Sequence, residues 1–164
     1  KGVRVKGRAG LVRTDQVVEQ EMGEIQFTED GLSGICIFDL SRNYIKGDMI
    51  RIDLFPDYDM EGVQELLARR IDALEDRSIK ELMNGILNKK MTGVILNEIA
   101  LNGERKAGKL NREEILKIAR LLKEWEISIT GTKGWKGNFG RSRARGNRQG
   151  YDGIEACAGT LLCG

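Results

Sequence analysis

The 164-residue chain has no histidine, one proline and three cysteines, and these shortages exclude whole classes of site. Without histidine, the chain alone offers neither a His-based general base nor an ordinary zinc site, and no Cys-x-x-Cys motif occurs. No apolar run approaches the roughly 20 residues of a membrane helix, and since residues 1–30 do not show the pattern of a signal peptide, we expect none. We therefore expect no metal site, no membrane partner and a cytoplasmic location, with Cys36 a buried thiol in a reducing compartment.

Acidic residues are absent from one segment, although the net charge of the chain is only +2. No Asp or Glu lies between Glu126 and Asp152, and this glycine-rich stretch carries four arginines: Arg141, Arg143, Arg145 and Arg148. Such segments bind RNA or DNA phosphates, or they are solvated and disordered, and composition alone leaves both interpretations open. Within it "GTKGWKG" follows a predicted strand without opening a helix, which disfavours a phosphate-binding loop.

Strand patterns dominate residues 1–56. The segments "VRVKG", "VVEQEMGEIQFT", "ICIFDL" and "MIRIDLF" are alternating or β-branched runs bounded by turn residues. In the last of them Ile50, Ile52 and Leu54 share one face of a half-buried strand. Alternation returns in "EISITGTKG", so residues 1–56 and 126–136 together predict a small β-barrel-like unit.

Helical periodicity replaces strand alternation over residues 57–125. Four amphipathic segments follow one another there, and three of them open at residues that cap helices: Asp59, Ser78 with Glu81, and Asn111 with Glu114. The fourth, shorter segment is "MTGVILNEIAL". The sequence therefore predicts an α+β fold, in which a small β-barrel-like unit is interrupted by an inserted four-helix α-subdomain.

The segment "GEIQFTEDGLSG", residues 23–34, has the glycines of a tight, exposed turn between strands. The hydroxyls of Thr28 and Ser33 and several backbone N–H groups would be available there to a ligand. An ordinary glycine-containing hairpin is the alternative, and the residues by themselves favour it.

A longer stretch that includes this turn, "GEIQFTEDGLSGICIFDLSR", resembles the signature of the BaiN-like or YhiN-like NAD(P)/FAD-dependent oxidoreductases. Members of that family typically read GE-x-x-FT-x-x-GLSG-x-P followed by LSR, and this chain departs from the pattern at Asp30 and Cys36. The segments "IDLFPD", "NGILNKKM" and "ITGTKGW" also look like the family, in the same order. The resemblance covers roughly residues 1–136.

The resemblance implies that the chain is the insert of a flavoprotein, lying on the substrate side of the flavin and incomplete for catalysis by itself. FAD would then be bound by a missing domain of the parent chain, with NAD(P)H and a small-molecule substrate as further partners, and no catalytic residue is assigned here. The residues nearest the substrate would be those of the turn: Thr28, Gly31, Leu32, Ser33 and Gly34. The competing interpretation is a nucleic-acid-binding module that uses the arginine-rich tail, and the resemblance makes nucleic acid an unexpected partner.

The family pattern also gives an interpretation of residues 137–164. After "GTKGW" the family continues with segments like "TMESK" and "VPGLYFA", which are absent as written. Codons for Tyr151 to Ala156, read one base later, encode Thr-Met-Glu-Ser-Lys, and the same frame continues to Val-Pro-Gly-Leu-Tyr-Phe-Ala. We therefore expect residues 137–164 to be out of frame or a disordered tail, whose arginines have no selected partner.

Overall fold

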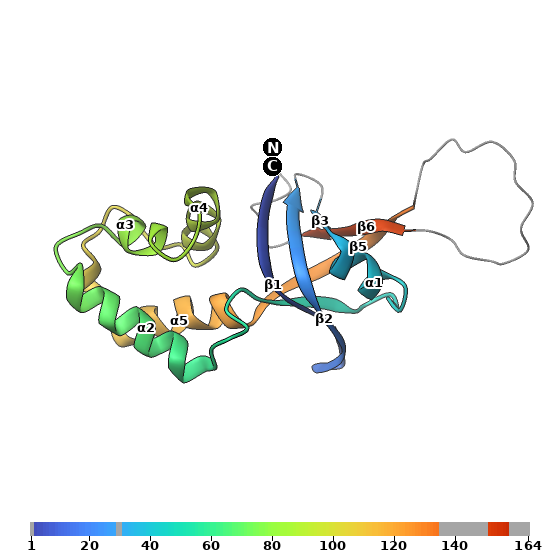
Figure 1. Cartoon of the computed structure of the whole chain (residues 1–164), viewed down its shortest axis with the longest axis horizontal. Coiled ribbons are helices and arrows are strands. Elements are labelled where there is room, and N and C mark those ends of the chain that lie inside the picture. Colours follow the sequence, from blue (N-terminus) through green and yellow to red (C-terminus); the bar gives the residue numbers. More distant parts are fainter. Residues whose placement is uncertain (1, 29–30, 135–150, 158–164) are drawn as a thin grey trace, which may run out of the picture.

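The computed structural model describes residues 2–28, 31–134 and 151–157; the strands gather in one part of it, and the helices between residues 60 and 123 lie to one side of them (Figure 1). The strands are β1 Val3–Arg13, β2 Gln16–Thr28, β3 Gly31–Ser33, β4 Met49–Asp53, β5 Trp125–Gly134 and β6 Tyr151–Cys157. The helices are α1 Ile35–Ser41, α2 Met60–Ala73, α3 Ile79–Asn84, α4 Lys89–Glu98, the 3-10 turn η1 Ala107–Lys109, and α5 Arg112–Lys123.

Antiparallel pairing curls the strands into a barrel. Strands β3, β2, β1, β4 and β5 form one strongly curled sheet, and β6 closes it by pairing with both β3 and β5. Alternate residues point inward, as period-two patterning requires, and they fill the interior with apolar side chains: Ala9, Leu11, Ile25, Phe27, Ile50, Ile52, Trp125 and Ile127. The rings of Phe27 and Trp125 stack there with centroids 5.3 Å apart.

One stretch predicted as a strand, "ICIFDL", is a helix instead. Residues Ile35–Ser41 form α1, whose first backbone bond is donated by the Phe38 N–H to the Gly34 carbonyl. Cys36, Ile37 and Leu40 are buried, whereas Ile35 is 81% exposed, and that spacing belongs to a helix. The prediction was wrong because a short apolar run carries no period that separates a strand from a buried helical turn.

The helices between β4 and β5 begin at the residues that the sequence indicates. The Asp59 carboxylate accepts the Gly62 N–H at 2.7 Å, and both capping boxes form at the starts of α3 and α5. A single cluster of buried apolar side chains runs from the barrel into the helices, and the Leu54 N–H donates to the Leu122 carbonyl where the two parts meet. The α+β class and the curled barrel sheet are thus confirmed, while the inserted four-helix subdomain stays a prediction.

The predicted out-of-frame or disordered tail lies partly outside the described residues. Strand β6, Tyr151–Cys157, falls within this segment, where the sequence shows no period. The four arginines of the tail lie outside the described residues, so the structure does not test the nucleic-acid interpretation. None of the helices in the described part of the chain is long and apolar enough to cross a membrane.

Candidate functional site

The predicted substrate-side turn is held together by its own polar groups. The Thr28 hydroxyl donates to the Gly31 carbonyl at 3.0 Å, and Leu32 is a core residue with 2% exposure, opposite Phe27 in the β2–β3 ladder. Gly34, at φ 116°, caps α1 so close to β2 that a Cβ there would lie 2.2 Å from a backbone carbonyl oxygen. These contacts explain the glycines and Thr28 as fold-forming residues, and their role beside a substrate stays a prediction.

Other residues of the same signature line a cavity of about 450 Å³ on the outer face of the barrel. Strand β1 contributes Lys6 and Gly7, β2 contributes residues 22–24, and the connector from β4 to α2 contributes residues 54–58. The lining is mostly apolar, with the Phe55 and Tyr58 rings edge to face at 6.3 Å. We call this space the apolar cavity; its volume is that of a site for a small organic molecule.

Two glycines that line the apolar cavity are paired across strands β1 and β2. Gly7 and Gly23 lie opposite each other in the β1–β2 ladder, and both line the apolar cavity. A Cβ on Gly7 would lie 2.6 Å from the Asp53 carbonyl oxygen, so β1 and β4 approach each other closely at this point. A Cβ on Gly23 would likewise meet Cys36, so both glycines allow close packing behind the cavity.

Lys123, at the end of α5, fixes the connector that forms the other wall. Its ammonium donates to the Asp53 carboxylate at 2.7 Å, to the Phe55 carbonyl at 2.9 Å and to the Tyr58 carbonyl. The side chains of Lys123 and Asp53 are only 11% and 12% exposed, and the Phe55 N–H also donates to Asp53. Because one cation holds two carbonyls of the connector and the Asp53 carboxylate at the end of β4, the position of the Phe55 and Tyr58 rings depends on the helical part of the molecule.

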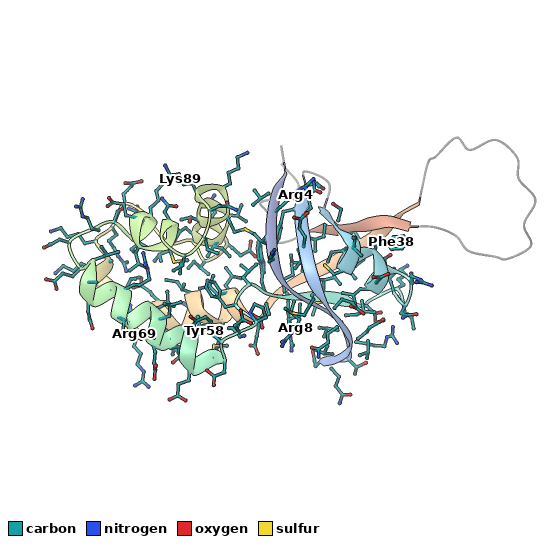
Figure 2. All side chains as sticks on the ribbon, in the orientation of Figure 1. Arg4, Arg8, Phe38, Tyr58, Arg69 and Lys89 are labelled. Atoms are coloured by element: carbon teal, nitrogen blue, oxygen red, sulfur yellow. The ribbon has the colours of Figure 1, made fainter. Side chains whose placement is uncertain are left out.

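A second, smaller hollow of about 270 Å³ is lined in part by this ion pair. We call it the polar cavity, because three cations and two carboxylates are among its lining residues: Arg8, Arg51, Lys123, Asp53 and Glu124. Figure 2 shows Arg8 and Tyr58 on the same side of the molecule, where the barrel meets the helices, whereas Phe38 lies at the far end of the barrel. The two cavities are neighbours along β1, since Lys6 and Gly7 line the apolar cavity and Arg8 lines the polar one.

Cys36 packs against Gly23, on the side of β2 opposite to these cavities. Its thiol donates to the Glu24 carbonyl at 3.3 Å, and a Cβ on Gly23 would lie 3.3 Å from the Cys36 Cβ. Burial raises the pKa of the Cys36 thiol, which disfavours the thiolate that a nucleophile needs. In the described part of the chain no group of three or more His, Cys, Asp or Glu side chains could hold a metal ion.

The apolar cavity includes residues of the signature, but not the turn that the sequence singled out. Gly23, Glu24 and the "IDLFPD" segment stand out as motif residues, but nothing in their spacing shows that they face each other. Lys123 carries no motif at all, and its partner Asp53 lies 70 positions earlier in the chain. The sequence signal for this site was the proline and the aromatic residues directly after a strand, which are typical of a rigid connector with apolar side chains on its surface.

Comparison with known proteins identifies a family model and a relative that this chain resembles. A family model described as "HI0933-like protein barrel and H2TH domain" matches residues 1–139. The chain is also 25% identical over 169 aligned residues to a 3-dehydro-bile acid delta(4,6)-reductase of Clostridium scindens. That alignment covers 99% of this chain and 37% of the reductase, so the chain spans little more than a third of that relative's length.

Proposed function

Because the chain belongs to the family of HI0933-like barrel and H2TH domains, we propose that it forms the substrate-side domain of an FAD-dependent, NAD(P)H-linked reductase. The family membership confirms the resemblance to BaiN-like proteins drawn from the sequence. The similar Clostridium protein is a reductase of a dehydro bile acid, which supports an unsaturated small molecule as the substrate of the parent enzyme. The rest of that enzyme, including its FAD-binding part, would be the partner of this chain.

The observation that carries this proposal is the apolar cavity. Two of its walls come from segments that the family resemblance singles out, Gly23–Glu24 and the connector at residues 54–58. An apolar lining with a few charged groups at its edge is the usual composition of a site that binds a small organic molecule. The part of this chain in catalysis would be to enclose the substrate, exclude water with Phe55 and Tyr58, and hold it in one orientation.

FAD itself does not fit the described residues. Dinucleotides bind where a glycine-rich turn follows a strand and opens a helix, and Gly131 to Gly134 instead continue strand β5. Gly34 opens only the seven-residue helix α1, and its backbone packs against β2. In such an enzyme the flavin supplies the hydride chemistry; we therefore assign its binding to a part of the parent protein outside this chain, and assign no catalytic residue here.

The organisation of the domain follows from the same proposal. We infer that residues 1–56 and 126–136 form the barrel part and that residues 57–125 form an inserted helical subdomain. The bonds from the Lys123 ammonium to Asp53, Phe55 and Tyr58, which we call the Lys123 clamp, support this division. They join the last helix to the connector at the point where the chain leaves the barrel.

For residues 137–164 we propose translation out of frame. The recovery of "TMESK" and "VPGLYFA" in one shifted frame supports it, and the match to the family model ends at residue 139. The pairwise similarity to the bile-acid reductase covers 99% of the chain, so the DNA sequence has to decide. Resequencing around codon 137 should show an inserted or missing base; an unbroken frame without the shifted motif would remove the idea.

The proposed function is tested on the longer polypeptide that contains this chain. We expect that protein to oxidise NAD(P)H when it is given an α,β-unsaturated ketone, and Phe55→Ala to lower kcat/KM at least about tenfold through lost apolar contact. Ile45→Ala, at a site 56% exposed in the loop before β4, is the matched control and should leave the rate unchanged. Equal rates for wild type, Phe55→Ala and Ile45→Ala would show that the apolar cavity is not the substrate site.

A further inference from the structure

Arg8 stands at the boundary between the two cavities. Its neighbours Lys6 and Gly7 line the apolar cavity, while Arg8 itself lines the polar one. Met22, which belongs to the apolar cavity, lies directly opposite Arg8 in the β1–β2 ladder. Cross-strand partners of this kind have Cβ atoms about 5 Å apart, so a guanidinium at position 8 is within reach of a molecule held against Met22.

The Arg8 side chain is half-buried and has no hydrogen-bond or ion-pair partner among the residues that the structure describes. The other two cations of the polar cavity already have carboxylate partners: Arg51 has Glu126 at 2.6 Å, and Lys123 has Asp53 at 2.7 Å. Of the two carboxylates that line the polar cavity, the one outside these pairs is the exposed Glu124. A partly desolvated guanidinium without a partner favours a carboxylate or sulfonate, which it can bind with two parallel N–H bonds.

We propose that the two cavities form one site for an amphipathic monoanion, with an apolar ring system in the apolar cavity and its carboxylate or sulfonate on Arg8. This inference rests on the proposed function, which it deepens by naming the chemical class of the substrate. The ring system would lie against Met22, Phe55 and Tyr58, and Arg8 stands where the lining of the apolar cavity is followed along β1 by that of the polar cavity.

Lys6 is the other cation that such a molecule would meet. The charges around Lys6 make it a poorer partner than Arg8 for the carboxylate or sulfonate. Lys6 is exposed and shares the apolar cavity with the carboxylates of Glu24 and Asp57. Glu24 has Arg4 as a partner at 3.4 Å, which leaves the exposed Asp57 to oppose Lys6. An exposed ammonium is also more strongly hydrated than a half-buried guanidinium, so it binds an incoming anion more weakly.

The test is a pair of fluorescence titrations on the 164-residue chain with two probes that differ in one group. The probes are 8-anilinonaphthalene-1-sulfonate and its uncharged counterpart N-phenyl-1-naphthylamine. Arg8→Gln should weaken binding of the sulfonate about tenfold and leave the uncharged probe within about twofold, because only a charge-assisted hydrogen bond is lost. Arg8→Lys should recover part of the loss, and Phe55→Ala should weaken both probes.

Two further variants sharpen the assignment. Glu124→Gln removes an exposed carboxylate from the lining of the polar cavity, whose charge would repel an anion there, and should tighten sulfonate binding by roughly threefold. Arg69→Gln, at an exposed arginine on α2, is the control for net charge and should change neither Kd. Circular dichroism and urea unfolding of each variant separate lost binding from lost folding.

Three results would overturn the proposal: equal losses for both probes in Arg8→Gln, no loss for either probe, or a loss that follows Lys6→Gln in place of Arg8→Gln. None of them bears on flavin chemistry, because the titrations use this chain alone. A parent protein that reduces uncharged ketones as well as their carboxylates would likewise reject the anion subsite while leaving the reductase assignment standing.

Discussion

Replacing Lys123 with methionine should destabilise the fold more than any other exchange of one charged side chain in the described residues. The substitution keeps the length of the side chain but removes the ammonium that holds the Asp53 carboxylate and the carbonyls of Phe55 and Tyr58. Breaking a buried ion pair by removing one partner costs about 3–5 kcal/mol. Asp53 keeps the Phe55 N–H and is 12% exposed, so we expect the lower end of this range, about 3 kcal/mol.

A double-mutant cycle separates the ion pair from general damage. Asp53→Asn alone should cost about 2 kcal/mol, and the double variant about as much as Lys123→Met alone, because one interaction is lost in both single variants. Lys117→Met is the matched control on the same helix: Lys117 pairs with Glu113 at 57% and 76% exposure, so its loss should stay under about 0.5 kcal/mol.

Urea unfolding at neutral pH, followed by far-UV circular dichroism, measures these free energies. The reasoning is refuted if Lys123→Met unfolds at the same urea concentration as Lys117→Met, or if the effects of Lys123→Met and Asp53→Asn are simply additive. Either result would mean that the clamp on the connector contributes nothing specific to the fold.

The remaining predictions concern the turns and the buried groups of the barrel. Gly34→Ala should destabilise by more than about 3 kcal/mol because its Cβ would meet a backbone carbonyl, whereas Gly47→Ala, which also has a positive φ but open space, should cost only about 1–2 kcal/mol in urea unfolding. The Arg13 hydrogen bond holds the pKa of Asp48 below its usual value, so Asp48 adds stability above the pKa of the unfolded carboxyl; this contribution should be lost as the pH falls through the lowered value. Arg13→Gln should flatten that part of the stability profile between neutral and acidic pH, and an unchanged profile would contradict the assignment. Cys36, in a variant without the other two cysteines, should react with a thiol reagent only on unfolding, because burial raises its pKa; rapid labelling of the native protein would show that the thiol is accessible.

The parts of the fold that sequence predicted are those that a few neighbouring residues determine. Asp59, Ser78 and Asn111 cap the helices that they were expected to cap, because an N-cap depends only on backbone N–H groups two or three residues ahead. Ile50 and Ile52 face the core because strand alternation is equally local. Helix α1 was missed because its seven residues are nearly all apolar, and its helical form depends on burial against β2.

The candidate site was less predictable, because long-range contacts build it. The signature glycines were visible, yet the space between Gly7, Gly23 and the connector exists only once β1, β2 and β4 have paired. The family resemblance singled out segments that line the apolar cavity, while the connector is fixed by Lys123, which no motif marks.

The central claim is that this chain encloses a substrate while another part of the parent protein holds the flavin. Equilibrium dialysis against FAD, with flavin absorbance read on the retained protein, tests it for both the 164-residue chain and the longer polypeptide. We predict a colourless 164-residue chain and a longer polypeptide that retains one flavin per chain. A 164-residue chain that retains stoichiometric FAD, or a longer polypeptide that retains none, would contradict the account.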